Sequence, residues 1–536
     1  MKKLLPLLVV FLFSLPSLNC SSPSSVDDSD GGGNGGGSNN IVTTRSHSVL
    51  IGTIGAAGGV ETVNAPGEPL DGMTIAVPGG AYDAAFDFDI SYAPIVSHDL
   101  GEYFDPVGPL IRVTTTTGAF ADSIMTLAIP ISIDSGSFAM AWAYDEFTGE
   151  VEGLPLFDLT NDRITIGTRH FATSNIYGGS SQGKSLLRPD DLNSYMNILI
   201  SRIPESELAA QGVIASGFSP GRDDWEFVNR GSFIAPGGHC AGQAMTALWY
   251  YSTIKSPQLF GLLDTEPGIS PDNRLGYRFA STVQKDSDFL GWANAMGWTY
   301  ALDRVSFNAF AASILQTGEP QSVLIRNSAG DGGHAMIIYK VDYNSGILYV
   351  ADPNYPGNRH FSTGEVSVRQ IKFANGKFEP YITGLRADKP GVSMDQIGYS
   401  GKSAFIDWAH ISNRWQEVQS GTIGNDRFPA AVCSLEIKGH NGVYLAPPVM
   451  HVGNDSINLW IRMTGIPNAN LGRRLYRGTE RVPLDLWIPL QSGGDRLGME
   501  MLAKVGNDYE WVDFQYTTYF IDNVRIEPAL VVGQKG

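Results

Sequence analysis

The sequence predicts a multidomain, β-rich chain in which an N-terminal antiparallel β-sandwich and a C-terminal β-sandwich flank a central α+β domain. Three observations support this fold class. The 536 residues exceed what one hydrophobic core usually organises. Short runs of alternating apolar and polar residues, separated by Gly, Pro, Asn and Asp, occupy both ends of the chain. Helical periodicity appears between these two regions.

The composition favours packed cores and excludes some partners. Apolar residues make up 43% of the chain and aromatic residues 10%, which is enough material for several cores. The formal net charge of -18 argues against a nucleic-acid partner, which requires a basic surface. The histidines and cysteines show no short metal-ligand spacing, and the glycine run at 31–37 lacks the strand and helix of a phosphate loop. We therefore expect neither a metal site nor a cofactor.

The first 45 residues carry signals for export. Two lysines precede an apolar run at 4–15, which is too short to span a bilayer but suits a secretory signal. The following Ser-Leu-Asn-Cys, ending at Cys20, resembles a bacterial lipoprotein cleavage site. The resemblance implies a signal peptide over 1–19, lipidation of Cys20, and an anchor in the membrane of the cell envelope, at the outer membrane or cell surface. Residues 20–45, rich in Ser, Asp and Gly, predict a flexible tether. An ordinary signal peptide or a short membrane anchor is the alternative.

Residues 46–180 are expected to form the first sandwich. Apolar runs typical of its strands lie at 73–77, 110–113, 125–129 and 138–142. Several short motifs in this region, including Gly55-Ala-Ala-Gly-Gly and Asp105-Pro-Val-Gly-Pro, with a late His170-Phe171, resemble the ZU-type β-sandwich domain. The resemblance implies a non-catalytic spacer or interaction module.

The next two regions differ in periodicity. Residues 181–428 are expected to form the α+β domain. Runs with helical spacing of apolar residues lie at 190–208, 289–298 and 307–315. Residues 429–536 return to alternating strands, for example at 459–463 and 514–520, and predict a β-sandwich of unknown type. Cys433 lies in a strand-like apolar run, where a buried, inert cysteine is the usual interpretation.

Cys240 lies where a glycine-rich turn opens onto a predicted helix. Pro236-Gly-Gly-His precedes it, and an apolar run ending in Leu-Trp-Tyr-Tyr follows it. Unpaired N–H groups and the positive end of the helix dipole favour a thiolate at such a position, and they can also stabilise an oxyanion. The alternatives are a small core cysteine and a disulfide with Cys433.

His334 begins the first strand of a predicted β-hairpin, and Asp352 ends the second. If Val341 pairs with Ile347, His334 lies opposite Asn354, and Asp352 lies on the same face. His334 would then take the thiol proton of a nucleophilic cysteine and later protonate the leaving group. Asp352 would orient the imidazole ring, with Asn354 as a second possible orienting residue.

Taken together, these three contexts resemble the papain-like cysteine peptidase superfamily, in particular its double-glycine, bacteriocin-processing branch. The motifs that carry the resemblance are Gly237-Gly-His-Cys240 opening a helix, Gly333-His334 on a strand, and Asp352-Pro-Asn354 after the next strand. The resemblance implies thiol-dependent hydrolysis or transfer at an amide, with Cys240, His334 and Asp352 as the catalytic triad and a peptide, possibly within a protein, as substrate.

One feature departs from that family. Its members commonly carry a glutamine several residues before the nucleophile, which completes the oxyanion hole, and this chain has none there. Asn229, Ser232 and Gln243 are the possible substitutes. Loss of one such donor costs about a hundredfold in rate. The leading hypothesis is a cell-envelope peptidase or amidase; a transglutaminase-like acyl transferase and a non-catalytic surface adhesion protein on the same scaffold are the alternatives.

Overall fold

The structure is a computed structural model. It describes residues 40–172, 194–229, 231–232, 234–235, 238–263, 274–287, 302–330, 332–360, 364–384, 391–402 and 404–428, and beyond these the backbone of strands between 431 and 521. The expected signal peptide, Cys20, most of the expected tether and the expected helix at 289–298 lie outside these residues. Among the residues that are described, no helix combines the length and apolarity needed to cross a bilayer.

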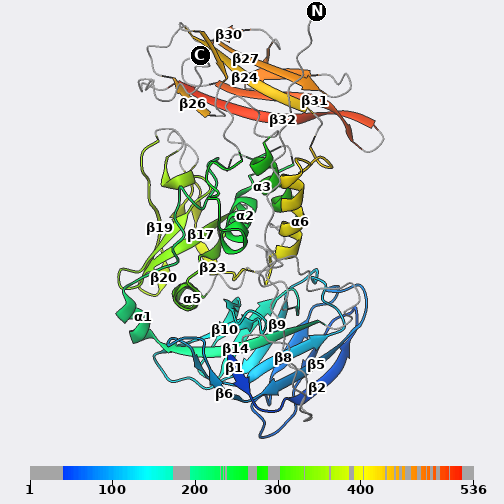
Figure 1. Ribbon diagram of the computed structural model, residues 1–536, viewed down its shortest axis with the longest axis vertical. Coiled ribbons are helices and arrows are strands. Elements are labelled where there is room, and N and C mark those ends of the chain that lie inside the picture. Colours follow the sequence, from blue (N-terminus) through cyan, green and yellow to red (C-terminus); the bar gives the residue numbers. More distant parts are fainter. Residues whose placement is uncertain are drawn as a thin grey trace, which may run out of the picture. The chain divides into compact units, whose positions relative to one another are not determined.

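Two antiparallel sheets form the first part of the chain (Figure 1). In spatial order, the seven-stranded sheet consists of β11 (Val151–Gly153), β10 (Ser137–Tyr144), β14 (Ser194–Pro204), β8 (Leu110–Thr115), β5 (Phe86–Ala93) and β2 (His47–Ile54), with β7 (Asp105–Pro106) paired to β14. The five-stranded sheet consists of β12 (Leu156–Leu159), β13 (Arg163–Thr168), β9 (Met125–Pro130), β4 (Thr74–Val77) and β3 (Gly59–Thr62). A separate antiparallel pair joins β1 (Ile41–Thr43) to β6 (Ile95–His98).

The strands of this region alternate as the sequence predicts. Every second residue of β9 is buried, and β8 shows the same period of two. Inward residues of both sheets, such as Ile90 and Leu127, belong to one hydrophobic cluster. The four apolar runs predicted as strands correspond to β4, β8, β9 and β10, so these predictions are confirmed.

The helix expected within residues 190–208 is wrong for most of its length. Residues 194–204 form β14, which pairs with β10 on one side and β8 on the other, and only the last part is helical, in α1 (Glu205–Gln211). The strand lies between two others and is buried along most of its length, and such a run does not separate a period of two from a period of 3.6. The first sheet therefore takes an inner strand from residues that we had expected in the next domain.

An antiparallel seven-stranded sheet organises the central part of the chain. In spatial order it consists of β20 (Lys377–Phe378), β19 (Arg369–Ala374), β18 (Ile347–Ala351), β17 (Gly333–Asp342), β16 (Gln321–Arg326) and β23 (Gln396–Tyr399), with β15 (Val213–Ala215) also paired to β17. β21 (Tyr381–Ile382) and β22 (Ser393–Met394) form a small separate sheet. The helical elements are α2 (Cys240–Thr253), α3 (Leu275–Asp286), α5 (Asp303–Thr317), α6 (Trp408–Gln419) and the 3-10 turn η4 (Pro356–Asn358).

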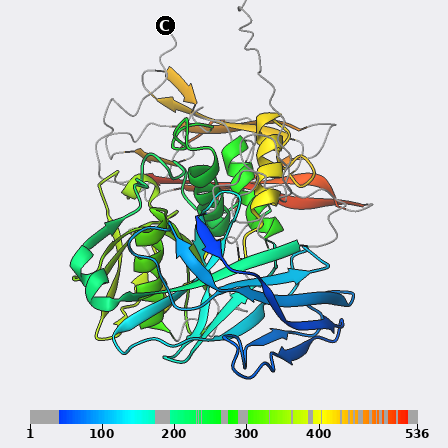
Figure 2. The same cartoon turned by 60° about the horizontal axis from the view of Figure 1, so that its bottom comes forward.

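Helices cover both faces of this central sheet. Along β17, Ala335 and Ile337 belong to the hydrophobic cluster that includes Leu248 of α2, whereas Met336 belongs to the cluster that includes Phe310 of α5. Alternate residues of a strand point to opposite faces, so α2 and α5 pack on opposite sides. Figure 1 and the turned view in Figure 2 both show α6 beside the green helices α2 and α3. The α2 helix and the helix expected at 307–315 are confirmed.

The hairpin of β17 and β18 has the expected register at one end only. At the turn, Ile347 pairs with Asp342 and not with Val341 as predicted. A β-bulge further along takes up the extra residue, so that Ile338 pairs with Val350, which is the predicted register. The correct register therefore reaches the end of the hairpin where His334 lies.

The last part of the chain forms two further sheets. The first contains β25 (Gly442–Leu445), β24 (Ala431–Gly439), β27 (Trp460–Pro467) and β30 (Ile488–Pro489). The second contains β26 (Val449–Val452), β32 (Asp508–Ile521), β31 (Asp495–Val505), β28 (Arg473–Arg477) and β29 (Glu480–Val482), and its β26–β32 pairing is parallel. These strands include residues 460–463 and 514–520 of the runs predicted as strands. The chain is thus rich in β-sheet over its whole described length, as predicted.

Candidate active site

Cys240 is the first residue of α2, and its thiol is free and buried. The preceding turn requires glycine at Gly238, where φ is +128° and a Cβ would lie 2.9 Å from the side-chain oxygen of Asn229. The same oxygen accepts a hydrogen bond of 2.6 Å from the backbone N–H of His239. The turn is thereby held so that Cys240 lies at the helix N-terminus, where unpaired N–H groups and the helix dipole favour a thiolate.

His334 and Asp352 meet this thiol from the central sheet. Nε2 of His334 lies 2.7 Å from Oδ1 of Asp352, and both side chains are buried. Since Nε2 faces the carboxylate, Nδ1 is the nitrogen that remains for the hydrogen bond between His334 and the Cys240 thiol. The structure brings the three side chains that the sequence selected into one buried cluster.

The electrostatics of the cluster favour charge separation. Burial by itself raises the pKa of Cys240, but the His334 ring and the backbone N–H groups of Ala335 and Ala241 outweigh burial and lower that pKa. Burial also opposes a charged His334, yet Asp352 and Cys240 raise the pKa of its ring above the ordinary value. Both directions favour a thiolate beside an imidazolium.

No protein-family model matches this chain, and no curated protein matches it. In the described part of the chain, no three or more His, Cys, Asp or Glu side chains are grouped so as to hold a metal ion. The chemistry of the thiol cluster is therefore inferred from the positions and environments of its own residues.

His239, next to the thiol, has a different environment from His334. Its ring is fully buried, lies edge-on to Tyr277 at 4.4 Å between ring centres, and has no hydrogen-bond partner among the described residues for either nitrogen. Burial lowers the pKa of His239 to about 3. This ring stays neutral, so His334 is the histidine that can hold a proton beside Cys240.

The three proposed oxyanion donors make other contacts. Nδ2 of Asn229 donates to Oδ1 of Asn354 at 3.2 Å, and Nε2 of Gln243 donates to the backbone oxygen of Phe227 at 2.7 Å. The Ser232 hydroxyl accepts from the backbone N–H of Ala235 at 3.2 Å. The side-chain amide nitrogens of Gln243 and Asn229 are therefore engaged in internal hydrogen bonds, and that of Asn229 connects two loops.

Asn354 supports Asp352 through its backbone. Its N–H donates to Oδ1 of Asp352 at 2.8 Å, while its side chain accepts the bond from Asn229. The side chain that we expected to orient His334 thus ties the loop before α2 to the end of β18.

Sequence reasoning missed two residues at the far side of Asp352. The Tyr381 hydroxyl donates to Oδ2 of Asp352 at 2.5 Å, and Nε of Arg369 donates to the Tyr381 oxygen at 2.9 Å. Tyr381 begins a two-residue strand well downstream of the hairpin, and no local motif marks it. The pairing of Arg369 with Val350, near the end of β18, is the feature that brings Arg369 close.

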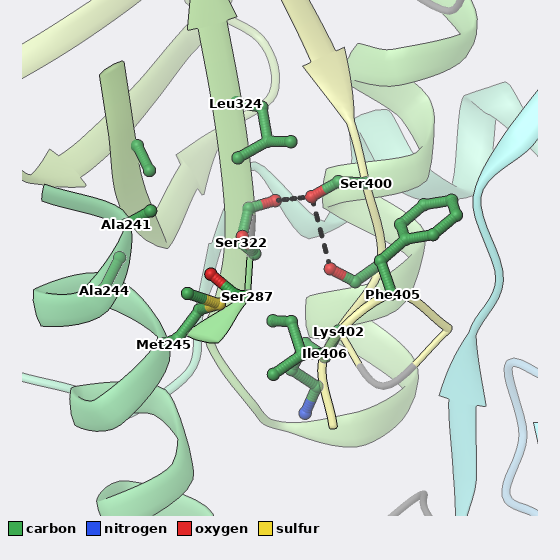
Figure 3. Close-up of a pocket in the computed structure, with 12 residues that line it drawn as sticks. Ala241, Ala244, Met245, Ser287, Ser322, Leu324, Ser400, Lys402, Phe405 and Ile406 are labelled. Carbon is green, nitrogen blue, oxygen red and sulfur yellow. Dashed lines mark hydrogen bonds between the residues drawn. The ribbon is translucent and has the colours of Figure 1, made fainter. Parts of the chain in front are cut away.

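A small cavity lies beside the cluster, between α2 and the strands β16 and β17 (Figure 3). Its volume is about 40 Å³, and its lining is mainly apolar. Ala241 and Ala335, which follow Cys240 and His334 in sequence, both border it. Figure 3 shows Met245 on the α2 side facing Ile406 and Phe405 on the other. The cavity thus adjoins the site without containing either reactive side chain.

Proposed function

We propose that the chain is a thiol hydrolase of the papain-like type, a peptidase or amidase that uses a Cys240–His334–Asp352 triad. The single observation that carries the proposal is the contact chain from thiol to imidazole to carboxylate, buried at the N-terminus of α2. A thiol helix on one side and an antiparallel sheet that carries the base on the other are consistent with a papain-like scaffold. In this proposal the first sandwich is a non-catalytic module.

The proposed reaction uses each member of the triad. The Cys240 thiolate attacks the carbonyl carbon of an amide, and the backbone N–H of Cys240 donates to the oxyanion that forms. His334 passes the proton on Nδ1 to the leaving nitrogen, the C–N bond breaks, and a thioester remains. His334 then takes a proton from water, which attacks the thioester and releases the acid and the thiolate. An amine in place of water would give transfer, as in a transglutaminase.

A second candidate function is a non-catalytic binding protein on the same scaffold. The observation that favours it is the engagement of Asn229 and Gln243 in internal hydrogen bonds, which leaves no described side-chain amide assigned to the oxyanion. The His334 ring beside the buried Cys240 thiol argues against this second function, because a purely structural cysteine gains nothing from a neighbouring base.

The test is alkylation of the intact protein by iodoacetamide as a function of pH, with intact-mass detection. At mildly acidic pH, we expect Cys240 to react at least about tenfold faster than in His334→Ala, since an ordinary thiol with a pKa of about 8.5 carries little thiolate there. Cys433→Ser is the matched control and should react like the wild type. Slow labelling of Cys240 that does not depend on His334 would contradict the proposal.

We also propose that the protein is exported and anchored in the bacterial cell envelope through a lipid on Cys20. The support is the order of charged, apolar and small residues before Cys20 and the tether-like composition after it. A clickable fatty acid supplied to expressing cells should label the wild type and not Cys20→Ala, which should leave the membrane fraction. Equal labelling of the two proteins would overturn this assignment.

A further inference from the structure

Both oxygens of the Asp352 carboxylate accept hydrogen bonds from neighbouring donors. Oδ1 accepts from Nε2 of His334 and from the backbone N–H of Asn354, and Oδ2 accepts from the hydroxyl of Tyr381. Asp352 is 1% exposed and Tyr381 is 3% exposed, so water does not provide a substitute donor. The Tyr381 hydroxyl is the one donor that the described structure gives to Oδ2.

Tyr381 is itself held in place from β19. Nε of Arg369 donates to the Tyr381 oxygen at 2.9 Å, and another guanidinium nitrogen donates to the backbone oxygen of Ile382 at 2.6 Å. The guanidinium also stacks on two rings, 4.3 Å from the centre of Tyr355 and 4.9 Å from that of Tyr381. These contacts fix the phenol in the orientation that donates to Asp352.

We propose that Tyr381, held by Arg369, is a positioning residue of the thiol site, which fixes the Asp352 carboxylate and thereby the orientation of the His334 ring toward Cys240. This inference rests on the proposed function. Tyr381 contacts neither the thiol nor a substrate, so it acts through Asp352 alone.

The charge balance of the cluster gives this role a measurable consequence. A thiolate, an imidazolium and a carboxylate carry one net negative charge, and the dipole of the Tyr381 hydroxyl stabilises that charge in a buried site. Burial opposes the ionised Asp352, and His334, Tyr381 and the N–H of Asn354 together keep its pKa below the ordinary value. Without the Tyr381 hydroxyl, Oδ2 has no donor, and the cluster takes up its proton at a higher pH.

Other titratable and charged groups face this cluster and must be held constant in a test. Arg369 contacts both Tyr381 and Tyr355. Asp224 lines a small cavity together with Asp352, and burial raises the pKa of Asp224 to about 6. A single-atom change in the phenol leaves all three in place. Tyr381→Phe is therefore the informative variant, and Tyr355→Phe, which loses a hydroxyl from the same aromatic group, is its matched control.

The experiment measures the rate of Cys240 alkylation by iodoacetamide across the acid and neutral pH range, in the full chain. The acid limb is the part of the profile in which the rate falls as the pH is lowered. For Tyr381→Phe we expect this limb to shift to higher pH by about one unit, which is about a tenfold lower rate at a given pH on that limb. Tyr355→Phe should follow the wild-type profile. A role of Tyr381 in packing alone would lower the melting temperature and leave the acid limb where it is.

Each outcome separates this inference from the proposed function. If the wild type shows a low acid limb that depends on His334 and Tyr381→Phe superimposes on it, the positioning role is overturned while the proposed function stands. If the wild-type thiol titrates like an ordinary cysteine, both fail. If Tyr381→Phe does not fold by circular dichroism, Arg369→Lys takes its place, since it keeps the positive charge but removes the Nε–H that donates to the phenol. A shift of the profile to higher pH supports the positioning role, and an unchanged profile overturns it.

Discussion

At the scale of single residues, Cys240, His334 and Asp352 share protons as one unit. A thiolate beside an imidazolium holds the same number of protons as a thiol beside a neutral imidazole. The pair therefore adds no pH dependence to stability between the ordinary pKa values of His and Cys, about 6.5 and about 8.5. The contribution of the Cys240 thiol to the pH dependence of stability can be measured only by removing Cys240 and keeping the other groups.

The pKa directions predict how that difference varies with pH. Because the pKa of Cys240 is lowered in the folded state, the unfolded chain binds the extra proton below about pH 8.5. The stability of the wild type relative to Cys240→Ala should thus rise with pH, by up to about 1.4 kcal/mol per pH unit, and level off above that value. His334 keeps Asp352 as a partner in both proteins, but in Cys240→Ala it loses the part of its raised pKa that comes from Cys240, so the slope lies below this limit.

Melting temperatures of the two proteins over a pH series test this prediction. A difference between them that is constant from acid to alkaline pH would mean that the folded thiol titrates like the unfolded one. Cys433→Ser, whose cysteine lies in a separate sheet, is the control for a cysteine substitution without an ion pair.

The residue scale also shows which parts of the site the sequence could predict. Cys240, His334 and Asp352 each stand in a local context with chemical meaning: a glycine-led helix start, a strand start and a strand end. Tyr381 and Arg369 do not, because they reach Asp352 through the sheet pairing of β18 with β19 and through a loop. Long-range pairing of this kind is set by packing and not by neighbouring residues.

At the scale of elements, periodicity succeeded where one face of an element differs from the other. The predicted runs in β8 and β9 alternate because one face of each strand is less buried. In β14, eight of the eleven residues are buried, so that contrast is lost, and spacing by three and four fits as well as alternation. The error in this strand therefore has a physical origin.

The β17–β18 hairpin shows how a local error need not reach the site. The turn is one residue shorter than predicted, because Asp342 and not Val341 pairs with Ile347. Within it, Gly346 has a φ of +64° and no room for a Cβ beside the backbone oxygen of Phe373. The bulge then restores the register, and Lys340, next to it, lies over the ring of Tyr349. A β-bulge shifts side chains from one face to the other, so this one decides that Asp352 faces His334.

At the scale of the whole molecule, buried polar contacts connect the first sandwich to the central domain. Lys402, which follows β23, is 1% exposed; its ammonium pairs with Glu319, and its backbone N–H donates to Glu152 of β11 at 3.2 Å. Burial by itself lowers the pKa of Lys402, but Glu319, Glu152 and Glu150 outweigh it and raise that pKa. The backbone N–H of Arg169 also donates to the oxygen of Ala404 at 3.0 Å.

We expect Lys402→Met to destabilise the protein by about 3 kcal/mol, because it leaves carboxylates without their cation at a buried position. The double variant Lys402→Met/Glu319→Gln should recover part of that loss, since it removes one of the uncompensated charges. Urea unfolding of the wild type and both variants measures these differences. Arg202→Met, which breaks a half-exposed ion pair with Asp105, provides the comparison and should cost less than about 1 kcal/mol of unfolding free energy.

Equal stability of Lys402→Met and Arg202→Met would show that the lysine is not a structural cation between the two regions. A selective loss in Lys402→Met, together with partial recovery in the double variant, would indicate that the sandwich and the domain that carries the thiol depend on one another for stability.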